Sequence, residues 1–301
     1  MKRLITPLSL LFLFLLLFVS ARAEPYRIVV IPDSQWASAK WPDLLVDMTR
    51  WIKENRESQN IRCVLHVGDM VQNGGNEEEW KRFDTAMSAL DGKVPYVLAV
   101  GNHDFDKIDG KRSPASFNRH FPVTRFKDRP SFGGSFPEGS NNNSFHTFQG
   151  GDTKWLVVSL TFAPNDKELE WANAVVAKHP AHRVIILTHS YLTHQGRDRT
   201  GVNIWEKFAS KHANISLVFC GHLSTVHREE TGPKGNKVYE MLFDWQNDRE
   251  PENNSYFAII EIDPEKEQMS ITAYSPTLDK ERTDNRSRFT IEKVDFLKAK
   301  E

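Results

Sequence analysis

Cysteine is scarce in this chain, with 2 cysteines among 301 residues. Two cysteines form one disulfide at most, so the fold must rest on a hydrophobic core rather than on cross-links. Cys63 and Cys220 each lie in an apolar stretch, which favours buried free thiols. A single disulfide between them is the alternative if the protein resides in an oxidising compartment.

An excess of charge of either sign is also lacking. Lys and Arg number 39 against 40 Asp and Glu, which leaves a net charge of −1. This balance excludes the broad positive field of a nucleic-acid-binding protein, so we expect no stable binding of nucleic acid. Internal repeats are absent as well, and the composition and length predict a folded chain with a substantial core.

Long apolar runs are missing except at the N-terminus, where one spans residues 4–19. It follows Lys2-Arg3 and precedes Ser20-Ala21-Arg22-Ala23, a pattern that predicts a signal peptide of residues 1–23. A retained anchor is the alternative, but the run is shorter than the roughly 20 residues that span a bilayer and contains Pro7. We therefore expect an exported protein, periplasmic or secreted, with no membrane span after cleavage.

Short runs rich in Val, Ile and Leu predict buried strands. Their nearly continuous hydrophobicity is typical of strands that are covered on both faces. They comprise residues 27–31, 62–67, 94–100, 155–160, 183–187 and 215–220. Helical spacing between several of them predicts βαβ units and a largely parallel sheet, hence an α/β fold.

Four segments have helical periodicity, and three later runs predict more strands. The expected helices are 43–55, 77–90, 166–178 and 203–212. In the second of them, Trp80, Phe83, Met87 and Leu90 share one face. The runs 238–243, 256–262 and 269–274 predict a second, strand-rich sheet, and we expect residues 24–301 to form a single domain.

Polar motifs follow the ends of five of the early strands. They are Asp33-Ser34-Gln35, Gly68-Asp69-Met70, Gly101-Asn102-His103-Asp104, Thr188-His189 and Gly221-His222-Leu223-Ser224. Each alone also fits a turn or a buried histidine. Because parallel sheets bind ligands beyond the carboxyl ends of their strands, we expect the five motifs to converge. Asp, Asn and His side chains are ligands of divalent metal ions.

In this order the motifs resemble those of the calcineurin-like metallophosphoesterases: D-x-H, G-D, G-N-H-D/E, a lone His after a strand, and G-H-x-H. The resemblance covers residues 27–226 approximately. It implies a four-layer αββα sandwich with mixed sheets, and hydrolysis of phosphate monoesters or diesters by a metal-bound hydroxide. It also implies one or two divalent ions per chain, drawn from Mn, Fe, Zn, Mg or Ca.

The resemblance implies a role for each matching residue. His103 would be the general acid or a transition-state contact, oriented by Asp104. The implied metal ligands are Asp33 and Gln35 at a first ion, Asp69 between the two ions, and Asn102, His189 and His222 at the second.

Two residues depart from the family pattern, and both belong to the first ion. Gln35 and Ser224 stand where the family usually has histidines. Gln can ligate through its amide oxygen, which favours Mn, Mg or Ca over Zn, whereas Ser is a poor neutral ligand. We considered His194 and His227 as substitutes and expect both to lie at the surface or beside the site. The first ion would then bind weakly or arrive with the substrate.

Residues 105–143 are rich in Pro, Gly, Ser and Asn, and we expect an irregular loop over the site. Its arginines either grip phosphate oxygens or are solvated surface charges. These arginines are Arg112, Arg119, Arg125 and Arg129.

Two other functions stay open at this point. The chain could be a catalytically weak or inactive binding protein that keeps one metal site, or an exported protein whose Asp, Asn and His hold Ca for structural reasons. The motifs do not define the phosphate ester, small or macromolecular, because specificity in this family resides in loops.

Overall fold

The computed structural model describes residues 24–108, 111–247 and 249–297. The expected signal peptide, residues 1–23, lies outside this range. Within the described residues, every helix is too short or too polar to cross a membrane.

The first sheet has seven strands and contains both the beginning and the end of the chain. Its order is β17-β16-β15-β1-β2-β3, with β18 also paired to β16. β1 pairs in parallel with β2 and antiparallel with β15, so it lies inside the sheet. The strands are β1 (Tyr26–Ile31), β2 (Ile61–His66), β3 (Tyr96–Leu98), β15 (Phe257–Asp263), β16 (Gln268–Ser275), β17 (Lys280–Glu281) and β18 (Arg288–Ile291).

The second sheet also has seven strands, in the order β13-β14-β12-β9-β8-β7-β6. Four of its strands, β14, β12, β9 and β8, are mutually parallel. β13 and β7 run antiparallel to them, and the edge strand β6 is antiparallel to β7. The strands are β6 (Phe132–Phe136), β7 (Asn143–Gly150), β8 (Thr153–Ser159), β9 (Arg183–Leu187), β12 (Ile215–Cys220), β13 (Val226–Thr231) and β14 (Lys237–Leu242).

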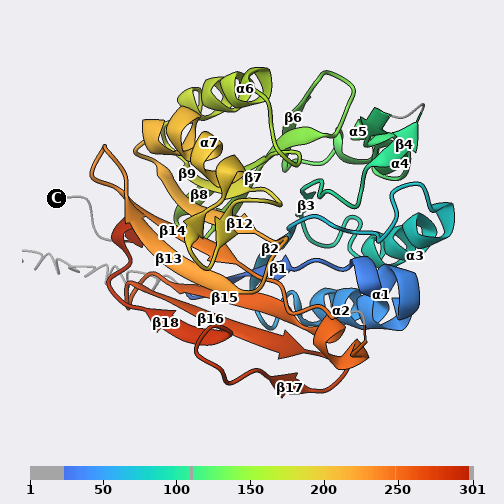
Figure 1. Cartoon of the computed structure of the whole chain (residues 1–301). Coiled ribbons are helices and arrows are strands. Elements are labelled where there is room, and N and C mark those ends of the chain that lie inside the picture. The colour runs from blue at the N-terminus through green and yellow to red at the C-terminus, as the bar shows by residue number, and fades with distance from the viewer. Residues whose placement is uncertain (1–23, 109–110, 248, 298–301) are drawn as a thin grey trace, which may run out of the picture.

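Helices cover the outer face of each sheet, which gives four layers (Figure 1). Over the second sheet lie α6 (Asp166–Ala177), α7 (Arg199–Lys207) and the short η1 (Ala209–Lys211). Over the first sheet lie α1 (Gln35–Lys40), α2 (Pro42–Asn55), α3 (Glu77–Ser88), α4 (Ala115–His120) and α5 (Val123–Phe126). The expected αββα sandwich with mixed sheets is confirmed. The remaining short elements are β4 (Asp106–Ile108), β5 (Lys111–Ser113), β10 (Leu192–Thr193), β11 (Gly196–Arg197), η2 (Pro251–Ser255) and η3 (Asp295–Leu297).

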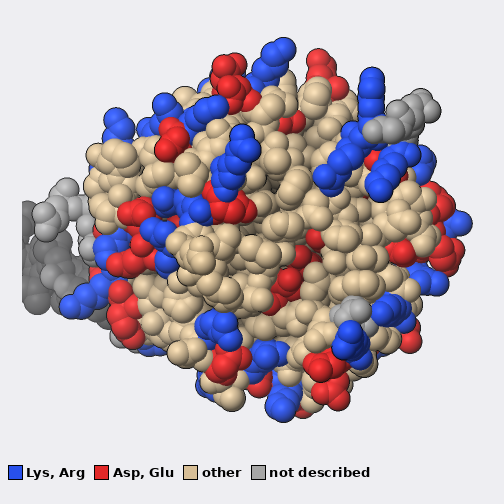
Figure 2. Space-filling view, in the orientation of Figure 1, with Lys and Arg blue, Asp and Glu red and all other residues tan. Residues whose placement is uncertain are grey.

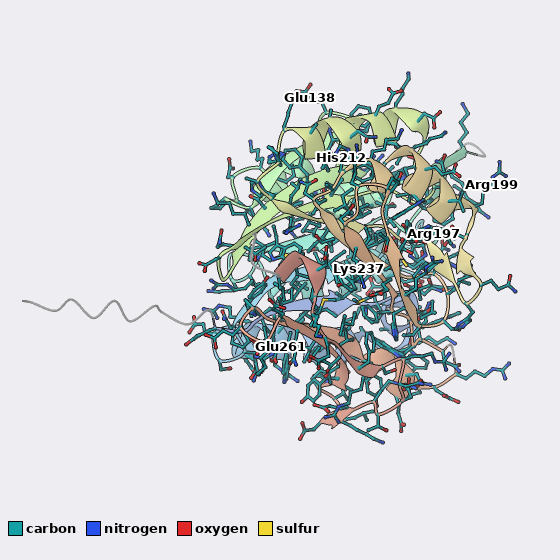
Figure 3. The ribbon with its side chains drawn as sticks, turned by 90° about the vertical axis from the view of Figure 1, so that its left-hand side faces the viewer. Glu138, Arg197, Arg199, His212, Lys237 and Glu261 are labelled. Carbon is teal, nitrogen blue, oxygen red and sulfur yellow. The ribbon has the colours of Figure 1, made fainter. Side chains whose placement is uncertain are left out.

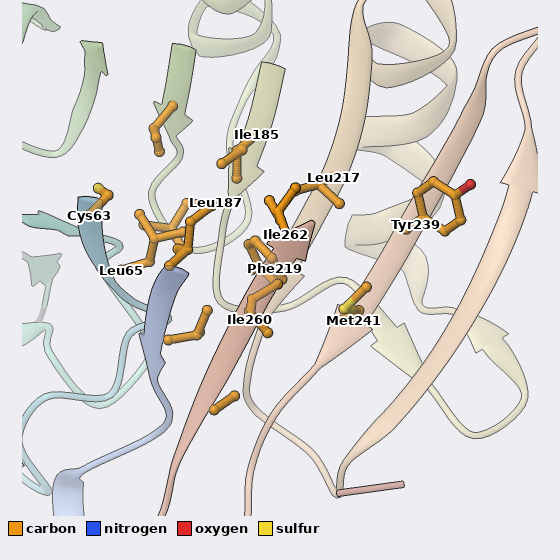
Figure 4. Close-up of a cluster of buried hydrophobic side chains, with 14 of the residues drawn as sticks. Cys63, Leu65, Ile185, Leu187, Leu217, Phe219, Tyr239, Met241, Ile260 and Ile262 are labelled. Atoms are coloured by element: carbon orange, nitrogen blue, oxygen red, sulfur yellow. The ribbon is translucent and has the colours of Figure 1, made fainter. Parts of the chain in front are cut away.

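The inner faces of the two sheets meet in a continuous hydrophobic core (Figure 4). Leu65 and Ile260 come from the first sheet, and Ile185, Leu217 and Phe219 from the second; all are fully buried. Each buried side chain of this size contributes about 1.5–3 kcal/mol. The core therefore holds the two sheets face to face and fixes the relative positions of their strand ends.

Local sequence signals explain the longer helices. In α2, Pro42 occupies the first turn, where its missing N–H costs nothing. The Asn76 side chain caps α3 by accepting the N–H groups of Glu78 and Glu79. The apolar face that the periodicity predicts is confirmed, since Trp80, Phe83 and Met87 of α3 are buried, as is Leu90 just beyond its end.

The prediction for the later strands was wrong. They do not form a sheet of their own: β14 joins β12 in the second sheet, whereas β15 and β16 extend the first sheet from β1. The parallel strands of the early chain are likewise divided between both sheets. Alternating hydrophobicity identifies a strand but not its partner, because pairing depends on distant contacts.

Residues 105–143 are also more ordered than expected. The segment contains β4, β5, α4, α5 and β6. Phe117 and Phe126 from its helices, and Phe121 directly after α4, are buried in the core that packs against the first sheet. The aromatic residues of this segment thus have a structural role. Cys63 and Cys220 are both buried and free, as favoured from the sequence.

Candidate metal centre

The centre lies where loops from both sheets meet. β1, β2 and β3 of the first sheet and β9, β12 and β14 of the second each end in a loop that carries a polar side chain of the site. Figure 2 shows acidic atoms at the floor of a hollow near the middle of this face, with mainly uncharged surface around them.

Three side chains have the spacing of a metal site. The ligand atoms of Asp69, His189 and His222 all lie within 4.8 Å of one another. His189 Nε2 is 3.0 Å from Asp69 Oδ2 and 3.1 Å from Asn102 Oδ1. The site thus offers a carboxylate, an amide oxygen and imidazole nitrogens close together, and this set of ligands fits a divalent cation.

The backbone fixes which nitrogen His189 presents to this point. Its Nδ1 lies 3.0 Å from the carbonyl oxygen of Val67 and donates to it, which leaves Nε2 as the ligand atom. A hydrogen bond from the other ring nitrogen is how proteins orient a metal-binding histidine.

Asp33 lies directly beside these ligands. It is 3% exposed, and its Oδ2 accepts the backbone N–H of His222 at 3.0 Å. Its Oδ1 is 3.9 Å from His189 Nδ1. The structure therefore brings Asp33, Asp69, Asn102, His189 and His222 together, as the strand-end argument predicts.

The loops adopt unfavourable backbone conformations at two of the ligands. Asp69 has φ 51° and His222 has φ 77°, in the left-handed region that side chains other than glycine rarely occupy. Such conformations cost about 1–3 kcal/mol and persist where the surrounding structure enforces them, often at functional sites.

Glycines give the carboxylates their space. A Cβ atom on Gly101 would lie 2.2 Å from Asp69 Oδ1, and one on Gly221 would lie 2.0 Å from Asp33 Oδ1. Neither position accepts a side chain without displacing a carboxylate. Glycine is therefore required at these two positions of the sequence motifs, because the backbone passes so close to a carboxylate.

The electrostatics of the site favour a bound cation. Burial raises the pKa of Asp33 well above its ordinary value, and repulsion from Asp244 and Asp69 adds to the effect. Burial by itself would lower the pKa of His189, but Asp69 and Asp33 raise it to about 10. In the metal-free protein a proton on His189 thus partly offsets the buried carboxylates.

His103 is partly buried, and its ring is not oriented by Asp104, which corrects the expectation. His103 Nδ1 lies 2.8 Å from the carbonyl oxygen of Gln72, and its backbone N–H donates to Asp69 Oδ1 at 2.8 Å. Both oxygens of Asp104 instead accept backbone N–H groups, from Met70 and Val71 on one side and Gly101 on the other. Asp104 ties the loop after β2 to the loop after β3.

Sequence reasoning missed His66, which supports two of these loops. His66 is fully buried at the end of β2, accepts the Gly68 N–H at 3.2 Å and contacts Ser34 Oγ at 2.9 Å. Burial lowers its pKa to about 3, so it stays neutral. A histidine at the end of an apolar strand was the available signal.

It also missed Asp244 and Gln246, in the loop after β14. Gln246 Nε2 lies 3.5 Å from Asp33 Oδ2, and the Gln246 backbone N–H donates to Asp244 Oδ1 at 2.8 Å. Burial raises the pKa of Asp244 to about 7. Asp and Gln after an apolar strand repeat the pattern of Asp33 and Gln35, and that repetition was the signal.

The residues considered as substitutes for the missing imidazoles lie elsewhere. His227 stacks on Phe289 with ring centroids 3.8 Å apart, and His194 is exposed in the turn between β10 and β11. Gln35 is 7% exposed at the start of α1, and its Oε1 is buried without a hydrogen-bond partner in the described chain. Ser224 is exposed.

One of the four arginines reaches the centre. Arg112 donates to the carbonyl oxygen of Asn102 and lies 5.8 Å from the ring of Phe162, which itself contacts His222. The other three pair with residues away from the centre: Arg119 with Glu77, Arg125 with Asp84 and Asp91, and Arg129 with Asp91.

Comparison with known proteins adds three likenesses and one family match. Residues 26–225 match the family model described as calcineurin-like phosphoesterase. The chain is 28% identical over 84% of its length to the uncharacterized protein YvnB of Bacillus subtilis, but spans only 20% of that protein. It is 23% identical over 58% of its length to the probable inactive purple acid phosphatase 24 of Arabidopsis thaliana, and spans 30% of it.

A solved structure has the same fold. The purple acid phosphatase PPD1 from yellow lupin (Lupinus luteus) superimposes with a TM-score of 0.58 at 14% identity, over 90% of this chain and 54% of the lupin chain. This likeness extends the fold comparison beyond the residues that the family model matches.

Proposed function

Since the chain belongs to the calcineurin-like phosphoesterase family, we propose that it is a metal-dependent hydrolase of phosphate monoesters or diesters. The observation that carries the proposal is the convergence of the Asp69, His189 and His222 ligand atoms within 4.8 Å. Divalent ions bound there would supply Lewis acidity toward the phosphoryl oxygens and lower the pKa of water.

The residues around the ligands have complementary tasks. His103 donates its Nδ1 proton to the Gln72 carbonyl, which leaves Nε2 free to exchange a proton with the leaving group. Arg112 is positioned by Asn102 and contributes a cation at the rim, suited to a phosphoryl oxygen. Phe162 packs on His189 and His222 and keeps water from that side of the ligands.

The test is a panel of esters assayed with each of several metals. Purified protein is stripped with chelator and reconstituted with Mn²⁺, Zn²⁺, Mg²⁺ or Ca²⁺, then assayed on aryl phosphate monoesters, aryl phosphate diesters and cyclic nucleotides. We expect turnover with at least one metal. His103→Ala should lower kcat by about 10²–10⁴ with metal content unchanged, and His194→Ala serves as the exposed control.

The same assay separates the alternatives. Metal binding without turnover on any ester favours a binding protein of this fold, which is the second candidate because of Gln35 and Ser224. Loss of metal together with activity in His103→Ala would make His103 a ligand rather than a proton carrier. Absence of both metal binding and turnover would overturn the proposal.

Export is a separate part of the proposal. The apolar run of residues 4–19 and the small residues before Glu24 support cleavage after Ala23. N-terminal sequencing of protein recovered from outside the cytoplasm should begin at Glu24. An intact Met1 in that fraction would contradict it.

A further inference from the structure

Beside the imidazole ligands lies a second group of side chains that offers oxygen atoms alone as ligands. Asp33, from the loop after β1, receives the Gln246 amide at 3.5 Å from the loop after β14. Asp244, two residues before Gln246, is close enough to repel the Asp33 carboxylate. The two loops come from different sheets, so the fold itself brings these groups together.

Two amide oxygens lack partners, one in the segment that follows β1 and one in the loop after β14. Gln35 Oε1 and Gln246 Oε1 are both buried and accept no hydrogen bond from the residues that the structure describes. The Gln246 amide contacts Asp33 Oδ2 through its nitrogen, and the unpaired oxygen belongs to the same planar amide group. A buried acceptor left unsatisfied is costly, and a bound cation removes that cost.

The family resemblance implies a first ion at Asp33 and Gln35, next to the position held by Asp69, His189 and His222. We propose that Asp244 and Gln246 complete the ligand set of this ion, which then consists of oxygen atoms only. Asp244 and Gln246 take the place of the imidazole that Ser224 does not provide. Both lie beyond residues 26–225, the part of the chain that matches the family model.

The donor set predicts which ion binds there. Carboxylate and amide oxygens favour Mn²⁺, Mg²⁺ or Ca²⁺, whereas the imidazoles of the neighbouring position favour Zn²⁺. Asp244, Gln246 and Ser224 also line one cavity of about 330 Å³. Asp244 and Gln246 therefore border a cavity that a side chain placed at residue 224 can also reach.

The experiment measures ions and not hydrolysis, so its result is independent of the proposed enzymatic function. Purified, chelator-stripped protein receives one equivalent of Zn²⁺ and then Mn²⁺, followed by calorimetric titration and elemental analysis. We expect one Zn²⁺ and one Mn²⁺ per chain. Two Zn²⁺ bound with equal affinity would overturn the oxygen-only assignment.

Variants separate the two positions. Asp244→Asn and Gln246→Leu should weaken Mn²⁺ binding at least tenfold while keeping the Zn²⁺ equivalent, which also reports that the variant is folded. His222→Ala should do the reverse. Glu252→Gln, an exposed acid on η2, is the matched control and should keep both ions.

A variant that should gain affinity for Zn²⁺ provides a second test. Ser224→His should add an imidazole to the oxygen position and shift its preference from Mn²⁺ toward Zn²⁺. The proposal fails if Asp244→Asn binds Mn²⁺ as tightly as the unaltered chain, or if Ser224→His binds Zn²⁺ no better there.

Discussion

Buried carboxylates occur on β14 of the second sheet and in the loops after β1 and β2 of the first sheet, and the two places differ in what balances the charge. Glu240 of β14 is fully buried and receives Arg197 at 2.5 Å and the Tyr191 hydroxyl at 2.7 Å. Arg197 also stacks on Trp205, 3.7 Å from its ring centroid. Figure 3 views the molecule from this side and labels Arg197.

At the metal centre the balance is different. Asp33 and Asp69 are nearly as buried as Glu240, yet the basic group between them is the single imidazole of His189. In the Glu240 group the protein brings its own cation; in the centre it leaves room for an external one. A buried acid paired with a guanidinium indicates a structural ion pair. Buried acids that share one imidazole indicate a site for a bound cation.

The largest expected effect comes from breaking the balanced group. Arg197→Met removes the nearer of the two cations beside Glu240 and leaves Arg228, whose Nε is 3.5 Å from Glu240 Oε2. The change should lower the free energy of unfolding by about 3 kcal/mol, the lower end of the range for a broken buried ion pair. Denaturant unfolding in chelator measures it. Arg197→Met combined with Glu240→Gln should recover much of the loss, and a double variant as unstable as the single one would show that packing on Trp205 dominates.

The opposite result is expected in the metal centre. Asp33→Asn removes a repelled, buried charge, so the metal-free protein should keep or gain stability. The same change should abolish much of the stabilisation by Mn²⁺, which is about 2.7 kcal/mol when the ion is at 100 times its Kd. Thermal melts with and without Mn²⁺ test both parts, and a metal-free variant that is clearly less stable would contradict the comparison.

The pH dependence sharpens the same contrast. The pKa of His189 is raised to about 10, so its stabilising proton is fully present below about 6.5 and is lost as pH rises toward 10. The raised pKa of Asp33 acts in the same direction, because the folded protein binds more protons than the unfolded chain.

Ion binding must displace these protons, so affinity should increase with pH by about tenfold per unit for each proton released. The difference in Tm between Mn²⁺-loaded and chelated protein should therefore widen from pH 6 to pH 9. Calorimetry in buffers of different ionisation enthalpy counts the protons. A difference in Tm that stays constant from pH 6 to pH 9 would show that ion binding releases no protons.

The smallest effect is expected at the rim. Arg112 is exposed, so its contact with a substrate oxygen is worth about 1 kcal/mol, a roughly fivefold rise in KM for Arg112→Ala. Ion content should not change, since Arg112 touches Asn102 only through the backbone carbonyl. Arg119→Ala, paired with Glu77 instead, is the control.

The sequence predicts which polar residues follow the ends of strands better than it predicts the hydrogen-bond partners of those residues. Asp33, Asp69 and His189 follow apolar runs whose burial is evident locally, and the fold brings them together. Asp104 shows the limit: its partners are the amides of Met70, Val71 and Gly101, a matter of loop geometry that no spacing reveals. The ligand roles themselves stay a prediction until ions are measured.

Other features depended on pairing between distant segments. The short α1 has too few residues for periodicity to show, and the turn-rich composition around residues 105–143 concealed buried phenylalanines. Asp244 and Gln246 reach Asp33 because β14 lies beside β12 at the same edge. A side chain from so late in the chain is found only once sheet order is known.

The position of β1 has a practical consequence for anyone who would excise this domain. Its antiparallel neighbour β15 begins at Phe257, well after residue 225, where the family match stops. A fragment that ends there would leave the backbone N–H and C=O groups on one side of β1 without partners. It would also expose one side of the core between the sheets, and both changes favour aggregation. Expression boundaries should therefore extend at least through β18, which ends at Ile291.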